Sequence, residues 1–165
     1  MPLTIRAATH DDLPDIVQIY NEAGVATTAT YDLEPVTLAE RTQWFERLRV
    51  RDYPVLVAVV EDRVVGFASY GPFRDKAGYA HTVEHSVYVA EGQRSGGVGR
   101  MLLGALLDYA RGRGIHVMVG VLDADNEASR AFHERLGFTE SAVLREVGLK
   151  FGRWLDVVFV TYQFD

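Results

Sequence analysis

The chain has 165 residues, a length that suits one globular domain with its own core, and we expect residues 1–165 to form a single domain. It contains no cysteine, which excludes disulfides, thiolate metal sites and a cysteine nucleophile, and we expect no metal cofactor. The net charge of −6 argues against nucleic acid as a partner, and no apolar run approaches the roughly 20 residues that a membrane-spanning helix needs. We see no signal-peptide pattern and expect a cytoplasmic protein without a membrane partner.

The first half of the chain predicts a strand, two helices and a hairpin. Residues 3–7 predict a short strand, and a helix that starts at Thr9 or Asp11 carries an apolar face as far as Tyr20. The weakly periodic segment 21–31 predicts a loop, and a second helix is expected over 35–50. Two apolar runs joined by Glu61-Asp62-Arg63 predict a β-hairpin, and a polar loop follows; these segments are 53–60, 64–70 and 71–80.

The segment from Val83 to Ala110 predicts a strand, a glycine-rich loop and a helix. Residues 83, 85, 87 and 89 alternate with Glu84, Ser86 and Tyr88, which is the period of a half-buried strand. Apolar residues at helical spacing after the loop predict one buried stripe, formed by Val98, Met101, Leu102, Ala105, Leu106 and Tyr109.

The loop between this strand and this helix reads Arg94-Ser95-Gly96-Gly97-Val98-Gly99. Three glycines in four positions let the backbone approach a ligand closely, and the following helix directs its free N–H groups at the loop. This combination favours binding of a phosphate or pyrophosphate, although a plain tight turn has the same pattern. The loop is not a P-loop, because no Lys-Ser or Lys-Thr follows, and its spacing does not match a dinucleotide fingerprint.

The last third of the chain predicts one more parallel strand, a helix and an antiparallel pair. An apolar strand over 115–121 follows the central helix, so it pairs in parallel with the strand at 83–89. A helix begins near Asn126 and ends at Gly137, and strands over 139–147 and 154–164 follow. The resulting order, β-α-α-β-β-β-α-β-α-β-β, predicts an α/β fold with a mixed sheet flanked by helices.

Several motifs together resemble those of a known family. Arg94-x-x-Gly97-x-Gly99 between a strand and a long helix resembles the acetyl-CoA signature of the GNAT superfamily of N-acetyltransferases, and Asn126, Ser129 and the run 132–138 resemble its next segment. The stretches TVEHSVYV (82–89) and KFGRWLD (150–156) resemble the phosphinothricin and methionine sulfoximine acetyltransferase group. The resemblance covers nearly the whole chain. It implies the GNAT acyl-CoA N-acyltransferase fold, acetyl-CoA as co-substrate and direct acetyl transfer to the α-amino group of a small amino-acid-like substrate.

The resemblance also implies a cofactor site. The glycine-loop N–H groups are expected to bind the pyrophosphate, and the backbone of the central strand is expected to pair with the pantetheine arm. Arg94 is alternatively a solvated loop charge, and Asn126 is alternatively a helix cap, although both of its roles are compatible. The expected cofactor-binding residues are Val87, Tyr88, Val89, Arg94, Ser95, Gly96, Gly97, Val98, Gly99, Arg100, Asn126 and Ser129.

Two catalytic residues are expected from the same resemblance. Glu84 is the candidate general base, acting directly or through water, and its alternative is a surface carboxylate in an ion pair. His85 is a competing base or simply a histidine that faces the core. His133 stands where many GNAT proteins carry a tyrosine that protonates the departing thiolate; the imidazole can fill that role, or solvent or the nascent ammonium supplies the proton.

The acceptor site is expected around Phe73, Arg74, Asp75, Lys76 and Tyr31, with Arg74 paired to a substrate carboxylate. An exposed polar loop is the alternative, and segment 21–31 is either a connector or a cover for the acceptor. Other acceptors, namely a polyamine, an aminoglycoside or a protein N-terminus, and a non-catalytic CoA-binding module remain alternatives. The resemblance further implies a homodimer and a role in resistance to amino-acid-like inhibitors.

Overall fold

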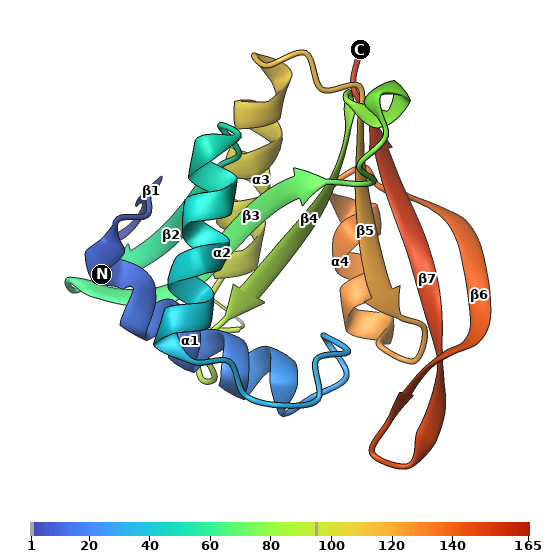
Figure 1. The fold of residues 1–165 in the computed structure, drawn as a ribbon, viewed down its shortest axis with the longest axis horizontal. Helices are drawn as coiled ribbons and strands as arrows, with labels where there is room; N and C mark the ends of the chain where they lie inside the picture. The colour runs from blue at the N-terminus through green and yellow to red at the C-terminus, as the bar shows by residue number, and fades with distance from the viewer. Residues whose placement is uncertain (1, 95) are drawn as a thin grey trace.

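A computed structural model describes residues 2–94 and 96–165. Within these residues, seven strands and four α-helices follow each other in the predicted order (Figure 1). The predicted mixed sheet with flanking helices is therefore confirmed. The elements are β1 (Leu3–Ala7), α1 (Leu13–Tyr20), α2 (Leu38–Val50), β2 (Val55–Val60), β3 (Arg63–Pro72), β4 (Thr82–Val89), α3 (Val98–Arg111), β5 (Val117–Asp123), α4 (Glu127–Arg135), β6 (Thr139–Lys150) and β7 (Arg153–Gln163).

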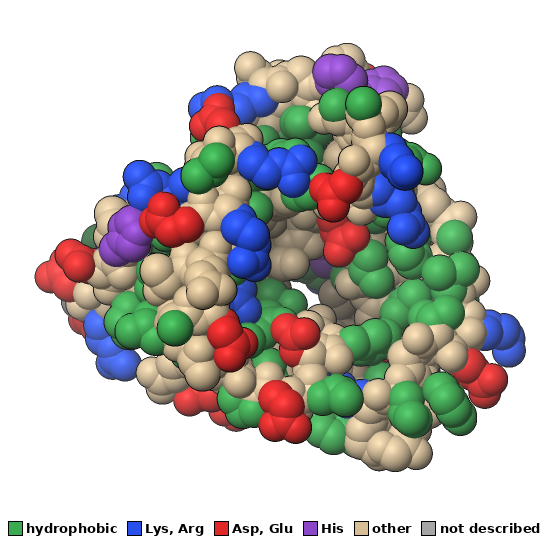
Figure 2. Space-filling model, viewed as in Figure 1, with side chains coloured by type: hydrophobic (Ala, Val, Ile, Leu, Met, Phe, Trp, Pro, Cys, Tyr) green, Lys and Arg blue, Asp and Glu red, His purple; other side chains and the backbone are tan. Residues whose placement is uncertain are grey.

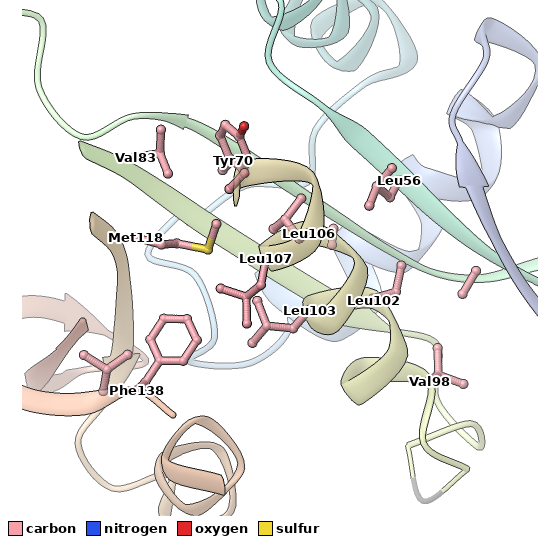
Figure 3. Packing of buried hydrophobic residues seen from close by; sticks show 14 of the residues in the cluster. Leu56, Tyr70, Val83, Val98, Leu102, Leu103, Leu106, Leu107, Met118 and Phe138 are labelled. Carbon is pink, nitrogen blue, oxygen red and sulfur yellow. The ribbon is translucent and has the colours of Figure 1, made fainter. Parts of the chain in front are cut away.

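The strands lie in the order β1-β2-β3-β4-β5-β7-β6, and both faces of this sheet are covered at β2 and β3. Alternate residues of β2 point to opposite faces: Leu56 packs with α3, whereas Val57 packs with α1 and α2. Burial on both faces explains why β2 is apolar throughout. Figure 3 shows the α3 side of the core, where four leucines of α3 meet residues from the sheet and from the chain after α4, including Leu56, Val83, Met118 and Phe138.

The sheet opens at its centre, and this opening positions the site. All neighbouring strands are antiparallel except β4 and β5, which pair in parallel only between Thr82–Glu84 and Val117–Val119. Beyond Glu84, β4 stays paired with β3, while β5 stays paired with β7. The two halves of the sheet therefore diverge, and Figure 1 shows the wedge between β4 and β5.

Two helix starts differ from the prediction. The first helix begins as a short 3₁₀ turn at His10–Asp12, and α1 itself begins at Leu13. The second helix was expected from residue 35, but α2 starts at Leu38, because Thr37 caps it by accepting a hydrogen bond from the N–H of Glu40 at 3.1 Å.

The predicted loop over 21–31 is wrong in its first five residues. Asn21–Val25 continues α1 as a π-helical turn, and Ala23, Gly24 and Val25 are buried. The weak periodicity of this stretch followed from small residues that pack tightly on the sheet, not from exposure to solvent. The irregular loop begins only after Val25.

The remaining corrections concern lengths and one buried stripe. Met101 is 44% exposed, and Leu103 and Leu107 are buried in its place. β6 is longer than predicted, β7 begins and ends one residue earlier than predicted, and the two strands turn at Phe151 and Gly152, both of which have positive φ. Figure 1 shows that the end of this hairpin extends beyond the rest of the molecule. We call this end, residues 143–154, the β6–β7 arm.

Candidate active site

A groove of about 860 Å³ lies where β4 and β5 diverge. Residues from β4, the start of α3, the end of β5 and α4 form its walls. The turn at Asn21–Val25 and the loop after it also contribute, so the groove brings together residues as far apart in the chain as Ala23 and Leu136. Predicted site residues in its lining are Val87, Tyr88, Val89, Arg94, Gly97, Gly99, Arg100, Asn126, Ser129 and His133.

The N-terminus of α3 offers unpaired backbone donors to this groove. Side chains cap α2 and α4, but Gly97 caps α3 without a side-chain hydrogen bond and has a φ of +79°. The first N–H groups of a helix have no partner within it, so those that follow Gly97 are free to bind an anion. Arg94 and Arg100 add positive charge beside them. This geometry fits a pyrophosphate.

Two predicted cofactor residues, Gly96 and Val98, are not in the lining of the groove. The N–H of Gly96 donates to the carbonyl of Gln93 at 3.4 Å, so it forms part of the turn. The side chain of Val98 is buried in the core. Ser95 lies outside the described residues.

The backbone of β4 beyond Glu84 presents an edge to the groove. The side of this edge that faces β5 has no strand partner in the described chain from Ser86 to Val89. Such an edge fits an extended amide-bearing chain, because its backbone groups can pair as in a sheet. Asn126 lines the groove and also caps α4, since its Oδ1 accepts from the N–H of Ser129 at 3.0 Å.

His85 and His133 form a buried pair in the wall of the groove. Their Nε2 atoms are 3.0 Å apart. The Nδ1 of His85 lies 3.0 Å from the carbonyl of Val119, where the β4–β5 ladder stops, and the Nδ1 of His133 lies 2.8 Å from the carbonyl of Ser129. His85 also packs directly on Gly120, where a Cβ would lie 2.5 Å from its ring.

Burial lowers the pKa of both imidazoles. That of His85 falls to about 3, first because of desolvation and then because of repulsion by His133, while the carbonyl of Val119 opposes the shift. The pKa of His133 is also lowered by burial. Two neutral rings carry two N–H protons for three contacts. A third proton would complete this network, but burial and the repulsion between the two rings oppose its uptake.

Glu84 lies on the opposite face of the sheet from His85. Glu84 is exposed, but desolvation by the surrounding protein still raises its pKa. The charge of Arg74 opposes this increase. Glu84 does not line the groove, but Ser86, about 7 Å further along the same face, does. Glu84 therefore stands beside the groove, where a raised pKa suits a base.

The predicted acceptor residues do not gather around one cavity. Phe73 contacts Tyr79 edge-on at 5.7 Å, and Arg74 lies 5.4 Å from the Phe73 ring. Asp75 forms an exposed ion pair with Arg51 at 3.4 Å, and Lys76 is exposed.

Tyr31 lies apart from these residues, in the loop after Val25, and packs against the β6–β7 arm. Its ring packs on Gly148, and its buried hydroxyl has no partner among the described residues. Burial raises its pKa, with further contributions from Asp123 and Asp156.

Sequence reasoning missed a second cavity of about 320 Å³ on the α1–α2 side of the sheet. Ser69 and Ser86 are opposite each other in the β3–β4 pair and both line it, and Ser86 and Tyr88 line the groove as well. The two cavities therefore meet at β4. Figure 2 shows a hollow near the centre of this face with charged side chains of both signs around it. The clue in the sequence was Arg41, which stands four residues before Phe45 on a helix face that is otherwise apolar.

The loop after Val25 spans the open side of the wedge. Thr28 donates a hydrogen bond from its Oγ1 to the carboxylate of Asp123 at the end of β5. The buried Lys150 donates from its Nζ to the carbonyl of Thr30 at 2.8 Å. These contacts tie the loop to β5 and β6 beside the groove.

Comparison with known proteins agrees with this architecture. A model of the Acetyltransferase (GNAT) family matches residues 13–138. An L-methionine sulfoximine/L-methionine sulfone acetyltransferase of Pseudomonas aeruginosa is 47% identical over 100% of this chain and 96% of that protein. A phosphinothricin N-acetyltransferase of Streptomyces coelicolor is 35% identical over 94% of this chain and 92% of that protein.

A solved structure gives the same result for the fold. A Salmonella typhimurium protein solved with its cofactor acetyl-CoA has a TM-score of 0.97 and 43% identity, over 100% of this chain and 95% of that one. Among the helices in the described part of the chain, none is long and apolar enough to cross a membrane. The family match and the relatives together lead to one conclusion: the chain belongs to the GNAT family of acetyltransferases and is an N-acetyltransferase.

Proposed function

We propose that the protein transfers the acetyl group of acetyl-CoA to the α-amino group of a small amino acid whose side chain carries oxygen, such as methionine sulfoximine, methionine sulfone or phosphinothricin. The observation that carries the proposal is the meeting of two cavities at Ser86 and Tyr88 of β4, one suited to acetyl-CoA and one to a small acceptor. The names of the 47% and 35% identical relatives support this class of acceptor.

The groove residues fit the co-substrate. The free N–H groups that follow Gly97, together with Arg94 and Arg100, hold the pyrophosphate, and the β4 edge from Val87 to Val89 orients the pantetheine arm. When bound, acetyl-CoA supplies the acetyl group as a thioester. The divergence of β4 and β5 gives that thioester a place between the two halves of the sheet, with the acceptor on the other side of β4.

Glu84 acts as the base in this proposal. An amine is mostly protonated at neutral pH, so it must lose a proton before its nitrogen bonds to the carbonyl carbon. A carboxylate with a raised pKa accepts that proton better than an ordinary one. The C–S bond breaks as the C–N bond forms, and the leaving thiolate takes a proton from solvent or through His133, which lines the groove and contacts His85.

Release of free CoA from acetyl-CoA tests the proposal with a panel of amines. The panel contains methionine sulfoximine, methionine sulfone, phosphinothricin, spermidine, an aminoglycoside and a short peptide. Turnover confined to the small amino acids is the expected result. Turnover confined to spermidine, the aminoglycoside or the peptide would contradict the proposed acceptor, and cofactor binding without any turnover would favour a binding module.

We also propose that the active form is a homodimer assembled through the β6–β7 arm. The arm exposes a group of large apolar side chains, and exposed apolar clusters mark interaction surfaces. In solution the mass from light scattering should be that of two chains, and Trp154→Glu should give monomers, whereas Leu33→Glu on a separate exposed loop should not. A monomeric wild type would contradict the proposal. The exposed apolar residues are Val143, Leu144, Val147, Leu149, Phe151 and Trp154.

In the cell we place the enzyme in the cytoplasm, where acetyl-CoA is used, and propose that it confers resistance to amino-acid-like inhibitors. Acetylation removes the charge of the α-ammonium group, which a target enzyme recognises. A sensitive bacterium that expresses the protein should grow at concentrations of methionine sulfoximine that stop its parent. Equal inhibition of both strains would contradict this role.

A further inference from the structure

The second cavity contains a buried cation that the reaction described above does not use. Arg41 on α2 is only 7% exposed and lines this cavity. Its guanidinium carbon lies 4.1 Å from the ring centre of Tyr20 and 4.4 Å from that of Trp44, so the two aromatic rings fix its position. Such contacts stabilise a cation, but they leave its N–H donors without acceptors.

Part of the hydrogen-bonding capacity of Arg41 is unused. Its Nε is buried and has no partner, and no carboxylate in residues 2–94 or 96–165 forms an ion pair with it. Asp32 also lines the cavity, but its carboxylate accepts from the hydroxyl of Tyr20. The charge of Asp32 also acts on Arg41, but no ion pair joins them, so the guanidinium keeps N–H donors for an oxygen-bearing ligand.

The shape of the cavity indicates how such a ligand lies. Ser86 forms the floor that is shared with the groove, and Glu84, two residues earlier on the same face, is the proposed base. Arg74 acts on the pKa of Glu84 through its charge, so a cation lies near that end, whereas Arg41 lines the same cavity as Ser86. Trp44 and Phe67 provide apolar walls suited to methylene groups.

We propose that Arg41 determines specificity by binding the oxygen-bearing end of the acceptor side chain, a sulfonyl, sulfoximine, phosphinate or carboxylate group. This inference rests on the proposed function, in which the α-amine lies near Glu84, and on the expectation from the sequence that Arg74 pairs with the α-carboxylate. The planar guanidinium presents parallel N–H groups that match two oxygens on one atom. An acceptor with no oxygen on its side chain leaves those donors unpaired, which is the strongest basis for discrimination.

The test compares methionine sulfone with methionine, which differ only by two oxygens on sulfur, in wild type and in Arg41→Met. Hydrogen bonds to charged groups are worth enough that kcat/KM for the sulfone should fall about 10- to 100-fold. For methionine it should change by less than about threefold, because that substrate makes no such contact. Arg41→Lys keeps the charge and the stem but loses the fork, so it should give an intermediate ratio of the two kcat/KM values.

Two further variants separate the outcomes. Arg74→Met should lower kcat/KM for both substrates by the same factor, because both carry the α-carboxylate. Arg49→Met, a change at an exposed residue of α2, the helix that carries Arg41, should alter neither value. If kcat/KM falls by the same factor for both substrates in Arg41→Met and Arg41→Lys, so that the ratio of the two values is unchanged, the inference is overturned and Arg41 has a structural role. Wild type that acetylates neither amino acid overturns the proposed function itself, and the inference with it.

Discussion

Acid should destabilise this protein through the buried histidine pair. The pKa of His85 is about 3 in the folded chain because of burial and of repulsion by His133, and about 6.5 when unfolded. Below pH 6.5 the unfolded chain binds a proton that the folded chain does not accept. The stability present above pH 6.5 is therefore lost as pH falls towards 3, at about 1.4 kcal/mol per pH unit. Between pH 6 and pH 4, the titration of His85 alone lowers the free energy of unfolding by about 3 kcal/mol, which is a large share of a typical domain's stability.

Urea unfolding of wild type and His85→Asn at several pH values from 7.5 to 4 measures this effect. Asparagine can still donate to the carbonyl of Val119 but does not titrate, so its free energy of unfolding should fall less steeply with acid, by about 1.4 kcal/mol per pH unit. His116→Asn, a change at an exposed histidine, serves as the control and should follow wild type. Parallel slopes for wild type and His85→Asn would refute the reasoning.

Two more predictions follow from contacts at the site. Arg74→Gln should move the acid limb of the kcat/KM profile to higher pH, because the charge of Arg74 holds the already raised pKa of Glu84 down; an unshifted limb would mean that Glu84 is not the base. Gly120→Ala should lower the free energy of unfolding by about 1–3 kcal/mol, because the new Cβ would lie 2.5 Å from His85 and 2.9 Å from Val160. Its control, Gly104→Ala within α3, has nothing within 4 Å of the new Cβ and should be neutral or stabilising; equal effects would contradict the packing argument.

Local patterns were enough to predict the elements that form the groove. The alternation in β4, the glycines before α3 and the apolar stripe of α3 all act within about 30 residues, and the structure places these elements as expected, although Met101 is exposed. Asn126 was correctly expected to cap α4 because its signal is equally local.

Features that depend on distant contacts were not predictable. The divergence of β4 from β5 is set by how far a long-range ladder extends, and His85 and His133 meet although 48 residues separate them. Arg41 gave a weak signal, because its aromatic partner Tyr20 lies 21 residues earlier on another helix. Tyr31 was assigned to the acceptor pocket from its place in a loop, and its contact with Gly148, far away in the sequence, could not be predicted from local patterns.

The central claim is tested most directly by identifying the product formed from acetyl-CoA and methionine sulfone, with wild type and Glu84→Gln compared at pH 7. The account predicts that mass spectrometry finds Nα-acetyl methionine sulfone and one free CoA for each, and that Glu84→Gln is slower by about 10²- to 10⁴-fold. Absence of this product in wild type would contradict the proposed acceptor, and a near-normal rate in Glu84→Gln would contradict the role of Glu84.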